Sequence, residues 1–309
     1  MLGQLALPLM CAPMSFASST ALARACVNAG VVAGWQGGAA TSEAEFSDYL
    51  VTLKAPGRAP PIVNMSARMA SDPAYEARFR LLEQARVPLV LSSIGDPTLM
   101  VERVHGWGGR VIKDVTTLRH AEKAIAAGVD GLMLTCAGAG GHTGALTPFA
   151  FVPAVRRIWG GLLIVAGGIA DAAGIRGALA LGADLACMGT RFIATPESGV
   201  RQGHRDLIVA AGMERIVPSA AINGVVANWI ADSLEAAGLD PRSLPDHRIA
   251  MPDGVKAWRD IFSAGQSVGL ISRELPVAAL VSELTAEFAR LGGWPGWERR
   301  LAEIERDWG

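Results

Sequence analysis

One histidine stands in a stretch of the chain that has almost no side chains. The segment from Cys136 to Gly144 reads Cys-Ala-Gly-Ala-Gly-Gly-His-Thr-Gly and follows an apolar run that starts at Gly131. Glycine lets the backbone come close to a flat or charged ligand, because no Cβ stands in the way. An imidazole titrates near neutral pH and suits general acid or base work, so His142 is the candidate catalytic residue. The alternative is a purely structural role in holding the loop.

Two later apolar runs each end in a glycine-bearing pair, Gly167-Gly168 and Gly189-Thr190. Glycine turns at the carboxyl ends of strands can direct backbone N–H groups and a helix N-terminus at a phosphate. One such pair is equally well explained by a tight turn. Two pairs at neighbouring strand ends favour a phosphate site.

An amide and an ammonium group are expected at other strand ends. Asn64 ends the third expected strand and Lys113 the fifth, so both side chains are predicted to point into the same mouth. Beside a phosphate site they could neutralise a ligand that becomes anionic, and a flavin ring fits because its reduced form carries negative charge. Metal binding is not expected, since Asp114 and Asp171 are interpreted as helix caps.

Eight short apolar runs alternate with helical patterns almost from the first residue. Their continuous apolarity is typical of parallel strands covered on both faces. Eight βα units predict an α/β protein with a closed (β/α)8 TIM barrel, whose active sites lie at the C-terminal ends of the strands. A doubly wound open sheet is the alternative, but no glycine fingerprint follows the first run. The expected strands are Leu7–Met14, Gly30–Gly34, Pro61–Met65, Pro88–Ser92, Arg110–Lys113, Gly131–Thr135, Leu162–Val165 and Asp184–Met188.

The periodicity changes after the eighth expected strand. Residues 203–262 contain four prolines and an Asn-Gly pair, and this length exceeds an ordinary connection. We expect a mostly helical insertion of residues 203–262 over the active-site mouth, with the barrel formed by residues 1–202 and 263–309. Helical patterns near Pro276–Leu291 and Trp297–Arg306 are expected to return to the barrel wall.

The composition of the chain limits the kinds of molecule that it is expected to bind. The 309-residue chain is 50% apolar, has a formal net charge of −1 and shows no basic stripe, so neither nucleic acid nor a membrane is expected as partner. The four cysteines form no CxxC pair, which predicts reduced thiols, a structural Cys136 and a cytoplasmic location. Residues 1–23 carry no charged side chain, but Ser19 fits a helix cap better than part of a signal peptide.

Five segments together resemble the nitronate monooxygenase family, formerly called 2-nitropropane dioxygenases. The resemblance covers nearly the whole chain, and its most specific part is the glycine-histidine element joined to the two downstream glycine motifs. It implies an FMN-dependent TIM barrel, a flavoprotein oxidoreductase that oxidises alkyl nitronates or nitroalkanes with O₂ to carbonyl compounds and nitrite. The segments are APM (12–14), CAGAGGHTG (136–144), VAGGIAD (165–171), MGTRFIATPES (188–198) and SAGQSVGL (263–270).

The resemblance also implies roles for individual residues. His142 matches the catalytic histidine of the family, which serves as base or as hydrogen-bond partner of the nitro group. The two glycine-bearing pairs would hold the FMN phosphate, and the backbone near Met14 with the side chains of Asn64 and Lys113 would contact the isoalloxazine ring. Gln266 matches a glutamine near the cofactor. The expected cofactor-binding residues are Ala12, Pro13, Met14, Asn64, Lys113, Thr135, Gly140, Gly141, Gly167, Gly168, Gly189, Thr190 and Gln266.

The chain departs from the family at two places. Many members carry glutamine where Thr135 stands, which affects one expected flavin contact. Many also carry a Gly-Gly pair where Ser15-Phe16 follows the first strand, which affects the floor of the substrate pocket. The same scaffold occurs in NAD(P)H:quinone reductases and in flavin-dependent enoyl-acyl-carrier-protein reductases, so NAD(P)H-dependent reduction of quinones or enoyl thioesters is the alternative function. A flavin-free lyase or isomerase of a phosphorylated substrate, a non-catalytic flavin-binding protein and a homodimeric assembly also stay open.

Overall fold

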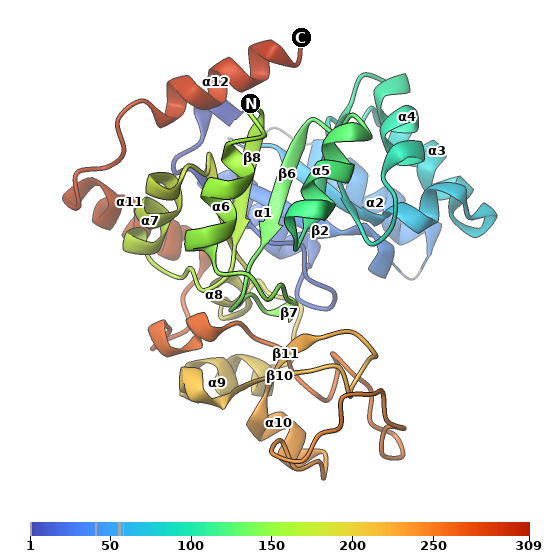
Figure 1. Cartoon of the computed structure of the whole chain (residues 1–309), viewed down its shortest axis with the longest axis vertical. Coiled ribbons are helices and arrows are strands. Elements are labelled where there is room, and N and C mark those ends of the chain that lie inside the picture. Colours follow the sequence, from blue (N-terminus) through green and yellow to red (C-terminus); the bar gives the residue numbers. More distant parts are fainter. Residues whose placement is uncertain (1, 41, 55–56, 58) are drawn as a thin grey trace.

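Eight parallel strands form a closed barrel (Figure 1). A computed structural model describes residues 2–40, 42–54, 57 and 59–309 of the chain. The strands follow one another around the barrel in chain order, and all eight expected strands are confirmed, with ends that differ by a few residues. They are β1 (Leu9–Cys11), β2 (Val32–Gln36), β3 (Pro61–Ser66), β4 (Leu89–Ser93), β5 (Arg110–Val115), β6 (Gly131–Thr135), β8 (Leu162–Ala166) and β9 (Leu185–Met188).

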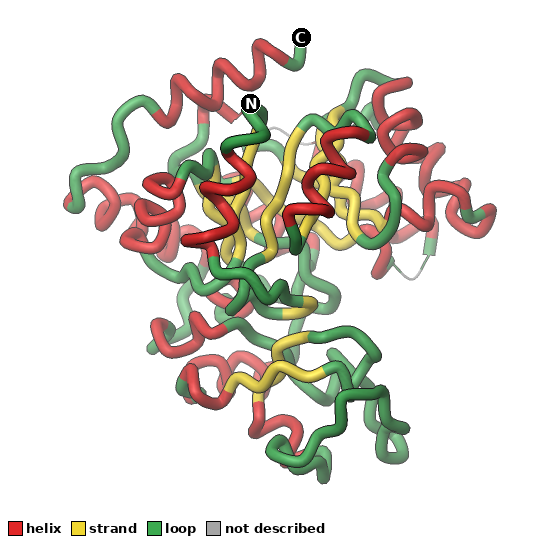
Figure 2. The backbone as a smooth tube through the Cα atoms, viewed as in Figure 1, coloured by secondary structure: helices red, strands yellow, loops and turns green. Residues whose placement is uncertain are grey.

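Helices connect the strands and surround the barrel (Figure 2). Their first turns carry the caps that the sequence predicts: the side chain of Ser19 accepts a hydrogen bond from Leu22 N–H at 2.9 Å, and that of Asp171 accepts one from Gly174 N–H at 2.7 Å. The helices are α1 (Thr20–Ala29), α2 (Glu43–Lys54), α3 (Glu76–Gln84), α4 (Thr98–Gly106), α5 (Leu118–Ala126), α6 (Pro148–Arg156), α7 (Ala172–Leu181) and α11 (Val277–Arg290).

The barrel strands are buried on both faces, which explains their continuous apolarity. The consecutive residues Leu162, Leu163, Ile164 and Val165 of β8, which point alternately to the two faces, are all fully buried. A parallel strand enclosed by the barrel interior on one side and helices on the other needs apolar side chains at every position. This core fixes the strand ends, and with them the loops that carry the candidate site.

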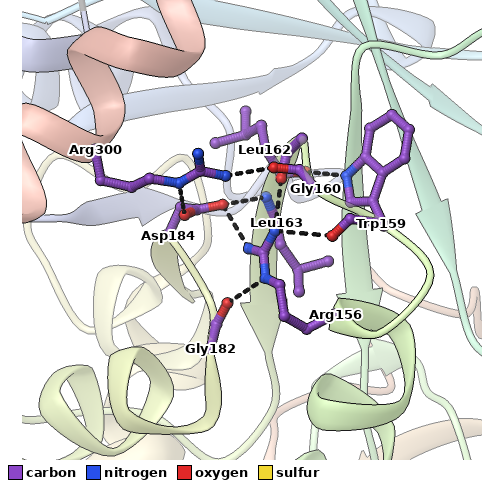
Figure 3. Close-up of polar contacts among 9 residues, drawn as sticks. Arg156, Trp159, Gly160, Leu162, Leu163, Gly182, Asp184 and Arg300 are labelled. Carbon is purple, nitrogen blue, oxygen red and sulfur yellow. Dashed lines mark hydrogen bonds and ion pairs between the residues drawn. The ribbon is translucent and has the colours of Figure 1, made fainter.

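A charged cluster fastens the last helix, α12 (Trp297–Asp307), to the barrel (Figure 3). Asp184, which directly precedes β9, accepts hydrogen bonds from Leu163 N–H at 2.8 Å, from Arg156 at 2.7 Å and from Arg300 of α12 at 3.1 Å. Arg156 also donates to the carbonyl of Gly182 at 2.8 Å. These groups lie at the amino ends of β8 and β9, so the cluster secures the end of the barrel opposite to the strand ends that carry the glycine motifs.

The segment after β9 is a separate layer beneath the strand ends (Figure 1), but it is not mostly helical as the sequence suggested. Its α-helices are α8 (Thr190–Ile193), α9 (Gln202–Ala210) and α10 (Ala231–Ala236), and apart from two short 3-10 helices the remainder is strand and loop (Figure 2). Strands β10 (Ile216–Ser219) and β11 (Ala227–Ile230) pair antiparallel. Prolines lack the backbone N–H that a helix needs, and three of them lie between 241 and 252.

The loops of this layer pack around their own apolar cluster. Trp229 of β11 is fully buried there beside Ala221, Leu234 and Ile261. The layer therefore needs no long helix to be ordered, because burial of these side chains compensates for the missing regular structure.

The four cysteines are free and buried, as predicted. Burial raises the pKa of the Cys136 thiol to about 12, which keeps it protonated and unsuited to act as a nucleophile. Within the part of the chain that the structure describes, every helix is too short or too polar to span a bilayer.

Candidate active site

A cavity of about 310 Å³ opens at the carboxyl ends of the barrel strands. This size lies in the range of small-molecule sites. The cavity brings together every predicted site residue except Lys113 and Gln266. The predicted residues that line it are Ala12, Pro13, Met14, Asn64, Thr135, Gly140, Gly141, His142, Gly167, Gly168, Gly189 and Thr190.

The two glycine-bearing pairs form a donor-rich wall of this cavity, and the wall is open at Gly168. Gly168 has a φ of +74°, and a Cβ added there would meet nothing within 4 Å. No described residue accepts a hydrogen bond from the backbone N–H of Gly168 or Gly189. Thr190 Oγ1 accepts a hydrogen bond from Gly265 N–H at 2.8 Å, which leaves its own proton to donate. Unused N–H donors beside empty space suit an anionic group such as a phosphate.

Asn64 contributes an acceptor to the opposite wall. Its side chain is 3% exposed, and its Nδ2 donates to the Leu91 carbonyl at 2.9 Å. This bond fixes the orientation of the amide, since a carbonyl can only accept. No described residue donates to Asn64 Oδ1, so this oxygen can accept from a ring N–H of a ligand.

Asp114, and not Lys113, lines the cavity from β5. The strand continues two residues beyond Lys113, to Val115, so Lys113 is not its last residue. Asp114 pairs in register with Met133, which also lines the cavity, and alternation then places Lys113 on the other face of the strand. The prediction that Lys113 points into the mouth and the interpretation of Asp114 as a helix cap are both wrong; Thr117 caps the following helix.

Lys113 acts on the cavity through its neighbour. Its ammonium group is buried and lies 2.8 Å from the Asp114 carboxylate, and it also donates to the Ser92 carbonyl at 3.1 Å. The ion pair holds one oxygen of the cavity-lining carboxylate in place.

Gln266 lies outside the cavity lining. Its backbone N–H donates to the Gly138 carbonyl at 3.0 Å, and its exposed side chain lies against Gly138. The adjacent Ser267 lines the cavity instead. The predicted segment is therefore near the site, but its contribution is to secure the histidine loop.

The loop that carries His142, the histidine loop, is held by the inserted layer, which is the segment that follows β9. Gly141 and His142 form β7 (Gly141–His142), which pairs antiparallel with β11 in a three-stranded sheet. Ser263 Oγ accepts from Gly141 N–H at 2.7 Å and donates to the Asn228 carbonyl at 2.5 Å. The layer beneath the barrel thus fixes the backbone that presents His142.

Burial lowers the pKa of His142 below its usual range, and the negative charge of Asp114 opposes this shift in part. The ring is consequently neutral at neutral pH. It meets the indole of Trp258 edge to face, with ring centroids 5.6 Å apart. Asn223 Nδ2 lies 3.1 Å from His142 Nε2.

Trp258 is a cavity residue that the sequence did not reveal. It has a φ of +68°, which is unusual for a bulky residue, and it packs on Trp229 at 4.4 Å between ring centroids. Residues held in such a strained conformation cluster at functional sites. No local sequence signal marks it, because the loop around it has no periodic pattern.

His204 of α9 is a second histidine that lines the cavity. The sequence did not identify it as a site residue because it lies in a helical pattern. Its Nε2 lies 3.0 Å from the Ser263 carbonyl, so Nε2 carries a proton and Nδ1 is a lone pair. Nδ1 is buried and has no partner among the described residues. Burial lowers the pKa of His204 to about 4, and the bond to Ser263 offsets a part of this effect.

This buried histidine predicts a loss of stability in acid. Below about pH 6.5 the unfolded chain binds a proton at His204 that the folded chain does not bind until about pH 4. The free energy of unfolding of the wild type should fall by about 2 to 3 kcal/mol more than that of His204→Gln between neutral pH and about pH 4.5. Urea unfolding as a function of pH measures this, with exposed His247→Gln as control. Parallel curves for wild type and His204→Gln would contradict the assignment.

Fold and cavity together define a (β/α)8-barrel protein with a small-molecule site at the C-terminal ends of its strands. The family model described as nitronate monooxygenase matches residues 54–287. The nitronate monooxygenase of Paraburkholderia phytofirmans is 34% identical over 255 residues, covering 75% of this chain and 69% of that protein. That of Pseudomonas aeruginosa is 30% identical over 270 residues, covering 79% and 76%. The structure of FabK from Thermotoga maritima has 26% identity and a TM-score of 0.77, covering 94% of this chain and 95% of that one.

The chain belongs to the nitronate monooxygenase family. Members of this family are flavin-dependent oxidoreductases, and the chain is an enzyme of this class. The flavin-free lyase or isomerase and the non-catalytic flavin-binding protein are therefore not retained.

Proposed function

We propose that the chain binds FMN and oxidises alkyl nitronates with O₂ to carbonyl compounds and nitrite. The observation that carries the proposal is the placement of His142 and of the open glycine wall around Gly168 in one cavity of a chain from this family. FMN supplies the transfer of electrons from the nitronate to O₂ when it is bound. The chain positions the reactants and excludes water.

The residues of the cavity fit FMN. The unused N–H donors of Gly168 and Gly189 and the hydroxyl of Thr190 provide a site for its terminal phosphate. Asn64 Oδ1 offers an acceptor to a ring N–H of the isoalloxazine, and the Met14 segment lines the wall between these groups. The cavity thus offers one anion site and one ring contact, and FMN, with one phosphate and one ring system, would satisfy both.

The substrate side of the cavity has apolar walls and few polar groups. Phe16, Ile94 and Trp258 line it together with His142. Apolar walls suit an alkyl chain, and a neutral imidazole can hydrogen-bond a nitro oxygen without an added charge. Phe16 lines the cavity and is 55% exposed, and the resemblance to the family implies glycine at this position, so we expect Phe16 to narrow the entrance for bulky substrates.

A reductase of enoyl thioesters that uses NAD(P)H is the second candidate, and the likeness to the FabK structure favours it. Product analysis separates the two functions. Incubation of the aerobic flavoprotein with propyl-2-nitronate should release nitrite and consume O₂ with no nicotinamide present. Absence of nitrite, together with consumption of NADH or NADPH in the presence of an enoyl thioester or a quinone, would favour the reductase.

A further inference from the structure

Asn223 reaches His142 from the inserted layer. Its Nδ2 lies 3.1 Å from Nε2 of the imidazole. The two residues are held at this separation by the sheet beneath the barrel, in which His142 of β7 pairs with Ala227 of β11 (Figure 1). Asn223 lies in the turn between β10 and β11, four residues before Ala227. Among the described residues, Nδ1 of His142 has no hydrogen-bond partner.

The orientation of the Asn223 amide is fixed by its own turn. Oδ1 accepts a hydrogen bond from Val225 N–H at 3.0 Å. A flipped amide would place two donors against each other at this position, so the NH₂ group must face His142. Because an amide NH₂ can only donate, Nε2 of His142 must be the acceptor.

We propose that Asn223 is a positioning residue that holds His142 in the neutral tautomer with its proton on Nδ1, so that His142 meets the ligand as a hydrogen-bond donor through Nδ1–H. A histidine free in water prefers the other tautomer, with the proton on Nε2. The Asn223 amide penalises that tautomer and the imidazolium, since both would set N–H against N–H.

The charges around the ring fit this assignment. Asp114 is the acidic group that acts on His142, and its carboxylate is engaged by Lys113 at 2.8 Å. Trp258 presents a ring to His142 and offers no acceptor for a second N–H. A nitro or nitronate oxygen, which can only accept, is the complement of an Nδ1–H donor; this step rests on the proposed function, whereas the tautomer does not.

The tautomer is measured without any substrate. Nitrogen NMR of the flavin-bound protein labelled with ¹⁵N-histidine distinguishes a protonated from an unprotonated ring nitrogen, and the His142→Asn spectrum identifies the His142 signals. The expected result near neutral pH is a protonated Nδ1 and an unprotonated Nε2. A protonated Nε2 in the wild type overturns the proposal, even if nitronate oxidation is confirmed. The expected pattern in a protein that does not oxidise nitronates leaves the proposal standing and removes the proposed function.

Substitutions at Asn223 test the cause. In Asn223→Asp the carboxylate accepts from Nε2–H, so the proton should move to Nε2, the pKa of His142 should rise, and kcat/KM for nitronate should fall about 100-fold. Asn223→Ala should give a mixture of tautomers and a loss of about fivefold. The matched control is Asn28→Asp, an exposed site in α1. An unchanged His142 tautomer in both Asn223 variants, each with its flavin bound, would refute the role of Asn223.

The two isosteres of histidine give an independent readout. The Asn side chain places its NH₂ near the position of Nδ1, and the Gln side chain places it near Nε2. His142→Asn should therefore retain about tenfold more kcat/KM than His142→Gln. The reverse order would assign the reacting position to Nε2 and contradict the proposal.

Discussion

Replacing Gly168 with aspartate should yield a folded protein that has lost its flavin. Gly168 has a left-handed conformation, which Asp and Asn tolerate better than other residues with a Cβ, and the new side chain would enter open space in the cavity. A carboxylate there repels the FMN phosphate. A loss of about 3 kcal/mol, which is moderate for like charges at close range, weakens the Kd for FMN about 100-fold. Flavin content after purification and titration of the apoprotein with FMN measure this change.

Two further substitutions identify the cause of the loss. Gly168→Asn has almost the same shape without the charge and should weaken FMN binding about tenfold or less. Gly177→Asp adds the same charge at an exposed helical position of α7, where a Cβ also meets nothing within 4 Å, and should leave FMN bound. Full flavin content in Gly168→Asp would show that the phosphate does not lie against this loop.

Removal of the imidazole at His142 has the second large effect. His142→Ala should keep its flavin and lower kcat/KM for nitronate by about 100- to 1000-fold, which is the usual cost of removing one donor to a charged oxygen of the reacting group. The ring contacts Trp258 and Asn223 at the surface of the cavity, so its loss should change the free energy of unfolding little.

Steady-state kinetics measure the fall in kcat/KM, and the flavin spectrum measures whether the variant retains its flavin. His247→Ala, at an exposed position in the inserted layer, is the matched control and should behave as the wild type. A His142→Ala variant that contains flavin and turns over nitronate at the wild-type rate would reduce His142 to a structural residue of its loop.

The barrel and its glycine loops could be predicted because their causes are local. Continuous apolar runs mark strands that are buried on both faces, and glycines at the ends of β8 and β9 mark places where the backbone must leave the barrel sharply. Strand order then follows chain order. The predicted cavity residues lie close together because the carboxyl ends of all the strands lie at the same end of the barrel.

The errors arose where a single residue shift or a distant contact decides the outcome. Lys113 and Asp114 lie on opposite faces of β5 because side chains alternate along a strand, and the pairing of Asp114 with the cavity residue Met133 shows that Asp114 is the one that faces the cavity. A longer reading of the apolar pattern through Val115 could have found Asp114. His204 and Trp258 enter the cavity only through the folding of the inserted layer, which no local pattern specifies.

The structure of the inserted layer also could not be predicted from local sequence patterns. Its strands β10 and β11 are four residues each, and they are ordered by pairing with each other and, through β11, with the His142 segment. Such short strands have weak sequence signals, and the helical patterns of α9 and α10 on either side suggested helices throughout. The consequence for function is that Asn223, which contacts His142 across 81 positions of the chain, could not be identified from spacing.

Anaerobic mixing of the purified flavoprotein with an alkyl nitronate, and separately with NADH and NADPH, tests most directly whether a nitronate is the electron donor of this enzyme. We expect the nitronate alone to change the visible absorption spectrum of the oxidised flavin, and air to restore it. Reduction of the flavin by NADH or NADPH, with no change in the presence of nitronate, would contradict the proposed function and identify a nicotinamide-dependent reductase.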